Sequence, residues 1–225
     1  MTTPANFDRL ARAYRWMEAL TFGPFLMRAR CAFLGKTKQA RRALVLGDGD
    51  GRFTARLLAA NPNLTIDAVD ASPAMLRQLL RNAGPNANRV STHAADIRTW
   101  QPQDRYDLIA SHFFLDCLAT EEVAALAARL RRAAAPNALW LLSDFDIPTA
   151  GAVRLIARPL VGLLYRAFGL LTGLAVRRLP NHSAALVSAG FTLARERKLL
   201  GGLLVGQIWT HSPRSETCPS LLQIC

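Results

Sequence analysis

The sequence predicts an α/β fold, a doubly wound and mostly parallel seven-stranded sheet with helices on both faces. Short apolar runs typical of buried strands alternate with amphipathic segments of helix length between residues 43 and 145. After residue 190 two strand-like runs flank a Gly-Gly pair, which indicates an antiparallel hairpin at one edge of the sheet. Five parallel strands and this hairpin give the seven strands.

The elements follow one another in a regular order. Five strand-like runs are expected at ALVLG, LTIDAVD, RVSTHAAD, YDLIASHFF and ALWLLSDF. Three helices are expected between them, at GRFTARLLAAN, SPAMLRQLLRN and TEEVAALAARLRRAA. Ser72 is predicted as the N-cap of the second helix, with Pro73 at its first position, and Thr120 as the cap of the third.

Three further segments surround this alternation. Residues 1–42 are expected to hold two helices, because Phe7 and Tyr14 belong to an apolar set at helical spacing. These helices are expected to form a lid over the cofactor, and the alternative is a helix pair bound permanently to one side of the sheet. The domain proper is expected at residues 43–210, with a helical insertion at about 150–190. Residues 211–225 show no helical or alternating period and are expected to be a mobile tail.

Composition limits the classes of function. The 225 residues suit one domain, and the net charge of +12 favours anionic partners, but the arginines are scattered in runs of two at most. Nucleic acid is therefore a less favoured partner than a small molecule. The four cysteines share no metal-ligand spacing, so no metal is expected. The apparent lack of a secretory signal and of an 18-residue apolar span predicts a cytoplasmic protein.

A glycine-rich turn, LVLGDGDGRF, follows the first strand. Gly47, Gly49 and Gly51 form G-x-G-x-G, whereas the dinucleotide fingerprint needs G-x-G-x-x-G. The loop also carries Asp48 and Asp50, whose carboxylates would repel a pyrophosphate. It therefore favours a cationic or phosphate-free ligand at the carboxyl end of the sheet.

An acidic residue ends the second strand. Asp70 lies nineteen residues beyond Gly51, and a carboxylate there can accept hydrogen bonds from both hydroxyls of a ribose. An adenosine with a cationic extension that lacks phosphate fits the loop and the acid together. That description matches S-adenosylmethionine.

The same segments resemble a known family. The glycine loop, Asp70, ADI at 95–97 and SHFF at 111–114 stand in the order found in class I S-adenosylmethionine-dependent methyltransferases, which have a Rossmann-like fold. FDRLARAYRWME near the N-terminus is similar to the quinone-biosynthesis group of these enzymes. The chain departs from the family pattern at Val45, where an acidic residue is usual; Asp48 is a partial substitute.

The resemblance implies a cofactor site and a function, methyl transfer to a small acceptor. The glycines with Asp48 would approach the methionine part of the cofactor, and Asp70 the ribose. The residues implied near the adenine are Ala71, Met75, Ala95, Asp96 and Ile97. Ser111 and His112 would border the transferred methyl group. For Met75 a core role, and for Asp70 and Asp96 a turn or cap role, are the structural alternatives.

Two residues are candidates for a general base. His112 follows the fourth strand and has a side chain whose ordinary pKa suits neutral pH, while Asp116 follows shortly after it. The alternatives are a backbone-bonded histidine and a capping aspartate. Phe113 and Phe114 are candidates for the acceptor side of the site, together with Tyr14 from the lid, since aromatic faces stabilise cations.

The acceptor itself is the most open question. Residues 151–180 combine five arginines with many apolar residues and no acid. A helix pair covering the sheet, an apolar acceptor pocket and peripheral contact with an anionic membrane all fit this composition. We expect a small apolar or aromatic acceptor, with an RNA-modifying enzyme and a non-catalytic binding protein as alternatives. The acceptor atom and the oligomeric state stay open.

Overall fold

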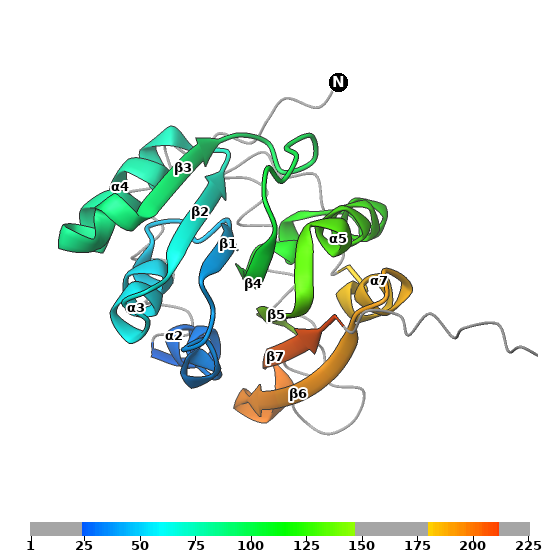
Figure 1. Ribbon diagram of the computed structural model, residues 1–225. Coiled ribbons are helices and arrows are strands. Elements are labelled where there is room, and N and C mark those ends of the chain that lie inside the picture. The colour runs from blue at the N-terminus through cyan, green and yellow to red at the C-terminus, as the bar shows by residue number, and fades with distance from the viewer. Residues whose placement is uncertain (1–23, 147–179, 212–225) are drawn as a thin grey trace, which may run out of the picture.

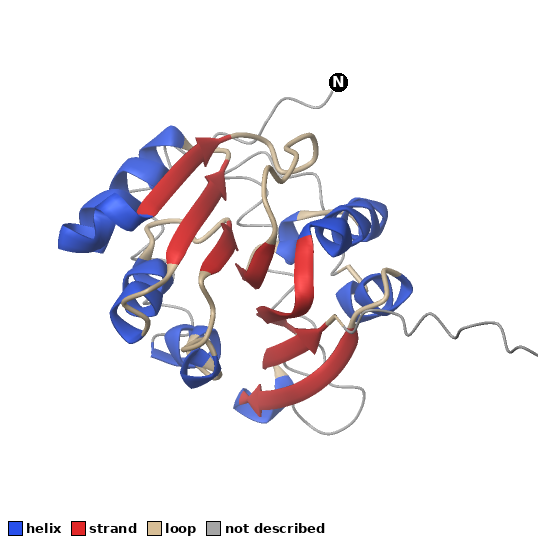
Figure 2. Ribbon diagram, viewed as in Figure 1, coloured by secondary structure: helices blue, strands red, loops and turns tan. Residues whose placement is uncertain are grey.

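A computed structural model describes residues 24–146 and 180–211 of the chain. Its seven strands form one sheet in the order β3-β2-β1-β4-β5-β7-β6 (Figures 1 and 2). The first five run parallel, while β7 is antiparallel to both of its neighbours. The strands are β1 (Arg42–Leu46), β2 (Thr65–Asp70), β3 (Val90–Ala94), β4 (Tyr106–His112), β5 (Ala134–Phe145), β6 (Thr192–Leu199) and β7 (Leu204–Thr210). The predicted fold class is confirmed.

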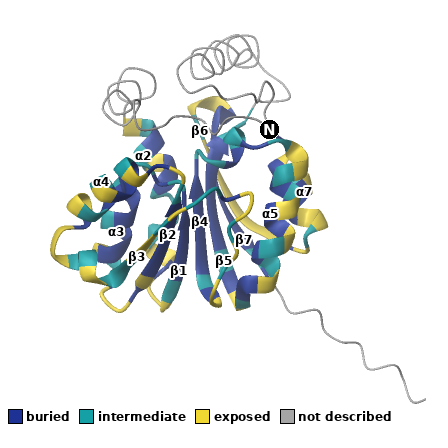
Figure 3. Cartoon of the chain, turned by 90° about the horizontal axis from the view of Figure 1, so that it is seen from above, coloured by how far each residue is buried: buried dark blue, intermediate teal, exposed yellow. Residues whose placement is uncertain are grey.

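Helices cover both faces of the sheet. Figure 3 shows α2, α3 and α4 on one side and α5 and α7 on the other. Their bounds are α2 (Pro24–Arg30), α3 (Arg52–Ala60), α4 (Pro73–Ala83), α5 (Thr120–Ala133) and α7 (His182–Ser188). Four short 3-10 helices join them: η1 (Leu34–Lys36), η2 (Gly84–Arg89), η3 (Leu115–Cys117) and η4 (Leu200–Gly202).

Side chains of each central strand alternate between two hydrophobic cores. Ala43 and Val45 of β1 pack in the core under α3 and α4, whereas Leu44 and Leu46 pack in the core under α5 and α7. Parallel strands covered on both faces are apolar throughout, as these runs are. Val45 is therefore a packing residue, which accounts for an apolar side chain where the resembled family has an acid.

Most predicted helix ends agree with the structure. Ser72 caps α4, since its Oγ accepts a hydrogen bond from the Met75 amide at 3.2 Å. The cap predicted for α5 is wrong, because the helix begins at Thr120 and the N-cap is Ala119. Glu122 satisfies that end instead, as its carboxylate accepts the Ala119 amide at 2.8 Å.

The predicted hairpin forms the outer edge of the sheet. β6 and β7 are joined through η4, where Gly201 has a φ of 65°. Residues 195–198 of β6 are the charged sequence RERK and are exposed along the edge strand. Charges on an edge strand discourage pairing with another sheet.

The described part of the predicted lid packs on the sheet. Leu26 of α2 lies in one cluster with Leu203 and Leu204, and a Cβ at Gly206 of β7 would come within 3.2 Å of the Ala29 carbonyl oxygen. This helix therefore belongs to the layer that covers β7. Residues 1–23, most of the predicted insertion and the predicted tail lie outside the described residues.

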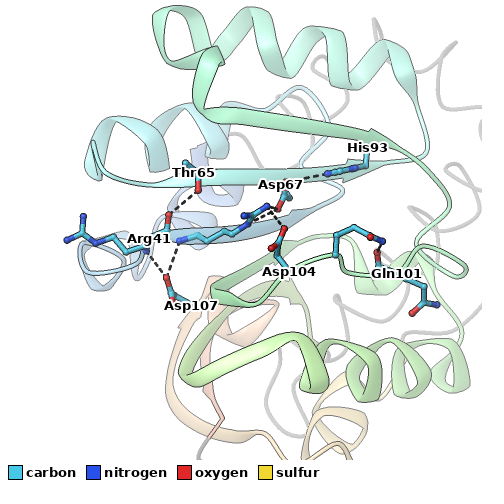
Figure 4. A network of polar contacts seen from close by, with 9 residues as sticks. Arg41, Thr65, Asp67, His93, Gln101, Asp104 and Asp107 are labelled. Atoms are coloured by element: carbon cyan, nitrogen blue, oxygen red, sulfur yellow. Dashed lines mark hydrogen bonds and ion pairs between the residues drawn. The ribbon is translucent and has the colours of Figure 1, made fainter.

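A polar network ties the strands together near the amino ends of β1 and β4 (Figure 4). Asp67 of β2 accepts hydrogen bonds from Arg42 at 2.9 Å and lies 3.3 Å from the ring of His93. Arg42 also forms an ion pair with Asp104 at 2.6 Å, and its amide donates to Asp107 at 3.1 Å. Each carboxylate of this network has a protein partner.

Candidate functional site

The glycine loop connects β1 to α3 in a backbone conformation that side chains disfavour. Gly47, Gly49 and Gly51 have φ values of 59°, 60° and 78°. A Cβ at Gly51 would lie 2.6 Å from the Cα of Leu79, and one at Gly47 would lie 2.1 Å from the Phe114 ring. The loop therefore needs glycine both for its φ angles and for close packing under α4 and beside β4.

Asp48 turns inward from this loop. Its Oδ2 accepts hydrogen bonds from the amide and hydroxyl of Thr54, at 2.8 and 2.7 Å, and thus satisfies the start of α3. Burial raises the pKa of its carboxyl, while the charge of Arg30 and the bonds from Thr54 oppose that change. The second oxygen, Oδ1, is buried and has no hydrogen-bond partner among the described residues. It is the atom of Asp48 that remains for a ligand.

Asp50 has a different role from Asp48. Its carboxylate forms an ion pair with Arg52 at 3.0 Å, and its backbone carbonyl accepts the Asn82 amide at 2.8 Å. The sequence argument treated both acids as facing the ligand. The structure corrects this, because Asp50 is neutralised by its neighbour and Asp48 uses one oxygen on α3.

Asp70 lies at the carboxyl end of β2, beside the loop. Leu46 and Val69 are register partners, and the Gly47 amide donates to the Val69 carbonyl at 2.9 Å. The Oδ1 of Asp70 accepts the Ser72 amide at 2.8 Å, which orients the carboxylate before α4 begins. Of the two neighbours predicted near the adenine, Ala71 is exposed and Met75 is buried.

The end of β3 places the ADI segment at the same edge, since Asp70 and Ala94 are register partners. Asp96 forms a turn, with its carbonyl accepting the Thr99 and Trp100 amides and its Oδ1 accepting the Arg98 amide at 2.9 Å. Ile97 is buried in the core under α5, and Ala95 packs against that core. The turn role weighed for Asp96 is thus present, whatever else its carboxylate binds.

Ser111 and His112 end β4 and point to opposite faces of the sheet. The Ser111 hydroxyl accepts the indole N–H of Trp140 at 2.8 Å in the core under α5. On the other face the His112 Nδ1 lies 3.0 Å from the Ser143 hydroxyl, and its ring meets Phe53 edge-on at 4.2 Å between centroids. Ser111 is therefore committed to packing.

His112 is held in its neutral form. Burial, and then the positive charge of Arg30, lower the pKa of this imidazole well below its usual value. Its Nε2 is buried and has no hydrogen-bond partner in the described part of the chain. A neutral histidine with one open nitrogen can accept or donate one hydrogen bond to a ligand.

The two phenylalanines after β4 separate. Phe113 has a φ of 53° and lies 5.2 Å from the Phe145 ring, with the guanidinium of Arg30 5.4 Å above its own ring. Phe114 packs against Gly47 and the core under α5. Tyr14, the third residue predicted on the acceptor side, lies outside the described residues.

Asp116 influences Asp144, a buried acid that was not predicted as a site residue from the sequence. It lies in η3, where its Oδ1 accepts the thiol of Cys117 at 3.5 Å. Asp144, at the end of β5, is only 1% exposed, and burial together with the charge of Asp116 raises the pKa of its carboxyl well above the ordinary value. The signal for Asp144 in the sequence is an acid inside the apolar run WLLSDF. Two further residues near the site were not singled out from the sequence: Ser143, which lies beside His112, and Arg30, a buried basic residue of α2.

Two kinds of feature are absent from the described residues. They contain no group of three or more His, Cys, Asp or Glu side chains arranged to hold a metal ion. Among their helices, none combines the length and apolarity needed to cross a bilayer.

Sequence comparison finds similarity to methyltransferases over part of the chain. Residues 44–140 match the family described as "Methyltransferase domain". A trans-aconitate 2-methyltransferase from Streptomyces avermitilis is 42% identical over 69 residues, 30% of this chain and 26% of that protein. The corresponding enzyme from Mycobacterium tuberculosis is 30% identical over 124 residues, 54% of this chain and 44% of that protein. The chain thus spans about a quarter to a half of the length of these relatives.

Solved structures agree on the fold. An O-methyltransferase family protein from Burkholderia thailandensis matches with a TM-score of 0.70 at 16% identity, covering 92% of this chain and 60% of that one. The N-methyltransferase NodS from Bradyrhizobium japonicum WM9, in complex with S-adenosyl-L-homocysteine, matches with a TM-score of 0.59 at 13% identity over 91% of each chain. These two structures agree with the fold predicted from the sequence.

Proposed function

We propose that this protein is an S-adenosylmethionine-dependent methyltransferase that acts on a small apolar or aromatic acceptor. The observation that carries the proposal is the meeting of the left-handed glycine loop with Asp70 at the carboxyl edge of β1 and β2. In a doubly wound sheet this edge is where ligands bind. The match of residues 44–140 to a methyltransferase domain supports the same reading.

The residues present fit that cofactor. Asp70 offers a carboxylate to the ribose hydroxyls, and the buried Oδ1 of Asp48 offers an acceptor to the ammonium group of the methionine part. The open Nε2 of His112 lies at the end of the neighbouring strand. The cofactor supplies a methyl group activated by a sulfonium, so the protein's task is to align the acceptor and to exclude water.

The direct test is calorimetry of the full chain with S-adenosylhomocysteine and, separately, with NAD. We expect a dissociation constant in the micromolar range for the former and no heat of binding for the latter. The reason is that the loop lacks the third glycine of the dinucleotide fingerprint and directs the buried Oδ1 of Asp48 to the ligand, which suits an ammonium group better than a pyrophosphate. Binding of NAD with no response to S-adenosylhomocysteine would overturn the proposal.

An RNA-modifying activity is the second candidate. Its support is the net charge of +12 and a tRNA1(Val) (adenine(37)-N6)-methyltransferase from Cronobacter sakazakii that is 38% identical over 79 residues, about a third of each chain. Against it, SHFF at 111–114 stands where amino-methylating nucleic-acid enzymes of this fold often carry an Asn/Asp-Pro-Pro-aromatic tetrad. RNA affinity that falls steeply with salt would favour this candidate.

The finer parts of the reading remain our proposals. They are kinship with the quinone-biosynthesis group, the cytoplasmic location and a lid formed by the N-terminal region. Because α2 packs on β7, the lid is now limited to residues 1–23. Deleting those residues is expected to preserve cooperative unfolding, weaken S-adenosylhomocysteine binding and abolish turnover. A deletion variant that does not fold would contradict the lid.

A further inference from the structure

Two acidic residues, Asp116 and Asp144, lie at the ends of β4 and β5. His112 and Ser143 are register partners, so Asp144 is the next residue of β5 toward the carboxyl edge. The Phe113 amide donates to the Ser143 carbonyl at 2.7 Å and carries the pairing one residue further. The chain then turns through η3, which brings Asp116 to the same edge.

The Asp144 carboxyl is buried but only partly satisfied. Its Oδ1 accepts the Phe145 amide at 2.8 Å, while its Oδ2 is buried with no hydrogen-bond partner among the described residues. A buried polar atom without a partner costs about 1–3 kcal/mol, so its retention calls for an explanation. A ligand that bonds to this oxygen is one.

The two acids do not titrate independently. After burial, the negative charge of Asp116 is the next cause that raises the pKa of Asp144, and the nearby amides of Phe145 and Asp116 act in the opposite direction. Asp146 just past β5 adds to the rise, and the pKa of Cys117 in η3 is raised well above its usual value by burial and by both acids, against a weaker influence of Arg98. Burial and the charge of Asp116 therefore both favour the protonated form of the Asp144 carboxyl.

We propose that Asp116 and Asp144 form a paired carboxyl site that binds the hydroxyl group of an aromatic acceptor and takes up its proton during methyl transfer. This inference rests on the proposed function, and it names the acceptor class. Phe113 and Phe114 follow β4 and Phe145 ends β5, so three aromatic side chains belong to the same strand ends, with Phe113 against Phe145 in one cluster and Phe114 in the core under α5.

The charge of the pair selects among acceptors. A carboxylate acceptor would meet the negative charge of the pair and be repelled, whereas a neutral hydroxyl can donate to it. In the step, an Asp116 oxygen takes the hydroxyl proton while the acceptor oxygen forms its bond to the methyl carbon. The electron pair of the broken carbon–sulfur bond stays on sulfur. The pair ends with one more proton.

The experiment uses three variants of the full chain, with Asp144→Asn and Asp116→Asn as the tests and Glu121→Gln as the control. Glu121 is an exposed acid in the first turn of α5, so its loss removes the same charge away from the pair. Asparagine keeps the shape of a protonated carboxyl, so folding should survive. Each variant is measured by calorimetry with S-adenosylhomocysteine, by transfer of labelled methyl to panels of phenols and aromatic carboxylates, and by carbon NMR of the aspartate carboxyls.

We expect both test variants to bind S-adenosylhomocysteine within about twofold of the wild type and to lose about 100-fold or more in transfer to phenols. Asp116→Asn should also lower the titration midpoint of Asp144 by about one pH unit or more, which a purely structural role would not do. The control should match the wild type. The proposed role of Asp116 and Asp144 would be overturned by methyl transfer only to carboxylates, or by transfer to neither panel. Unchanged transfer rates in both variants, or an unchanged titration midpoint of Asp144, would also overturn it. If the wild-type protein did not bind S-adenosylhomocysteine, the proposed function itself would be overturned.

Discussion

Two groups of polar side chains, one near the amino ends of β1 and β4 and one at the carboxyl edge, differ in how far they are satisfied. Near the amino ends, Asp67, Asp104 and Asp107 are paired with Arg42 or its backbone, and His93 completes the network. At the carboxyl edge, one oxygen each of Asp48 and Asp144 and one nitrogen of His112 have no partner among the described residues. Since unsatisfied buried groups cost stability, the first arrangement is that of a structural tie and the second that of a binding site.

The largest expected effect tests the shape of the carboxyl edge. Gly51→Ala should lower the free energy of unfolding by about 2–5 kcal/mol, as a left-handed φ and a 2.6 Å approach to the Leu79 Cα are both penalised. Urea unfolding measures the loss. Gly84→Ala is the control, since its φ of 56° is also positive but its Cβ would meet nothing within 4 Å, so its loss reports backbone strain without a packing clash. Equal losses would show that packing against α4 is unimportant.

The second largest effect is expected for substitution of Asp70, the acid at the end of β2. Asp70→Ala should weaken S-adenosylhomocysteine binding by about 1.5–3 kcal/mol, the range for hydrogen bonds to a charged group. Calorimetry gives the dissociation constant, and urea unfolding gives the stability, which should fall by less than the binding energy because the neutral Ser72 amide is what the carboxylate orients in the fold. An unchanged dissociation constant would mean that another residue holds the ribose.

Substitution in the polar network around Arg42 and Asp67 should lower stability and leave cofactor binding nearly unchanged. Asp67→Asn removes the charge that faces Arg42 and His93 and is expected to cost about 1–2 kcal/mol of unfolding free energy. The dissociation constant for S-adenosylhomocysteine should stay within about twofold of the wild type. If binding suffered as much as it does in Asp70→Ala, the distinction between the two edges would be lost.

The smallest effect concerns the pH dependence of stability. The pKa of His112 is lowered in the folded protein, so the unfolded chain binds the proton more readily and stability falls as the pH drops below about 6.5. His112→Gln should remove about 1 kcal/mol of the loss between pH 6.5 and pH 5.5. Urea unfolding at the two pH values measures it. His182, whose pKa burial also lowers, supplies a remaining loss in the same direction and is unaltered in the variant.

Much of the fold was predictable because its signals are local. Apolar runs and helical periods marked the five parallel strands and their helices, and a Gly-Gly turn marked the hairpin. Errors arose where one local signal had a competitor: Thr120 is a common N-cap residue, but Glu122 provides the capping bond from within the helix. The site was predictable where it depends on one strand end, as for the glycine loop and Asp70.

The sequence by itself determined which residues need unusual backbone angles and which acids end strands, because φ preferences and hydrophobic periods act over a few residues. Only the tertiary structure decided that Asp48 turns under α3, that Ser111 and His112 face opposite cores, and that Asp116 influences the pKa of Asp144. Contacts such as His112 with Ser143 join residues 31 positions apart. They follow from strand order and register, which bring distant segments of a chain to one edge and which no local pattern encodes.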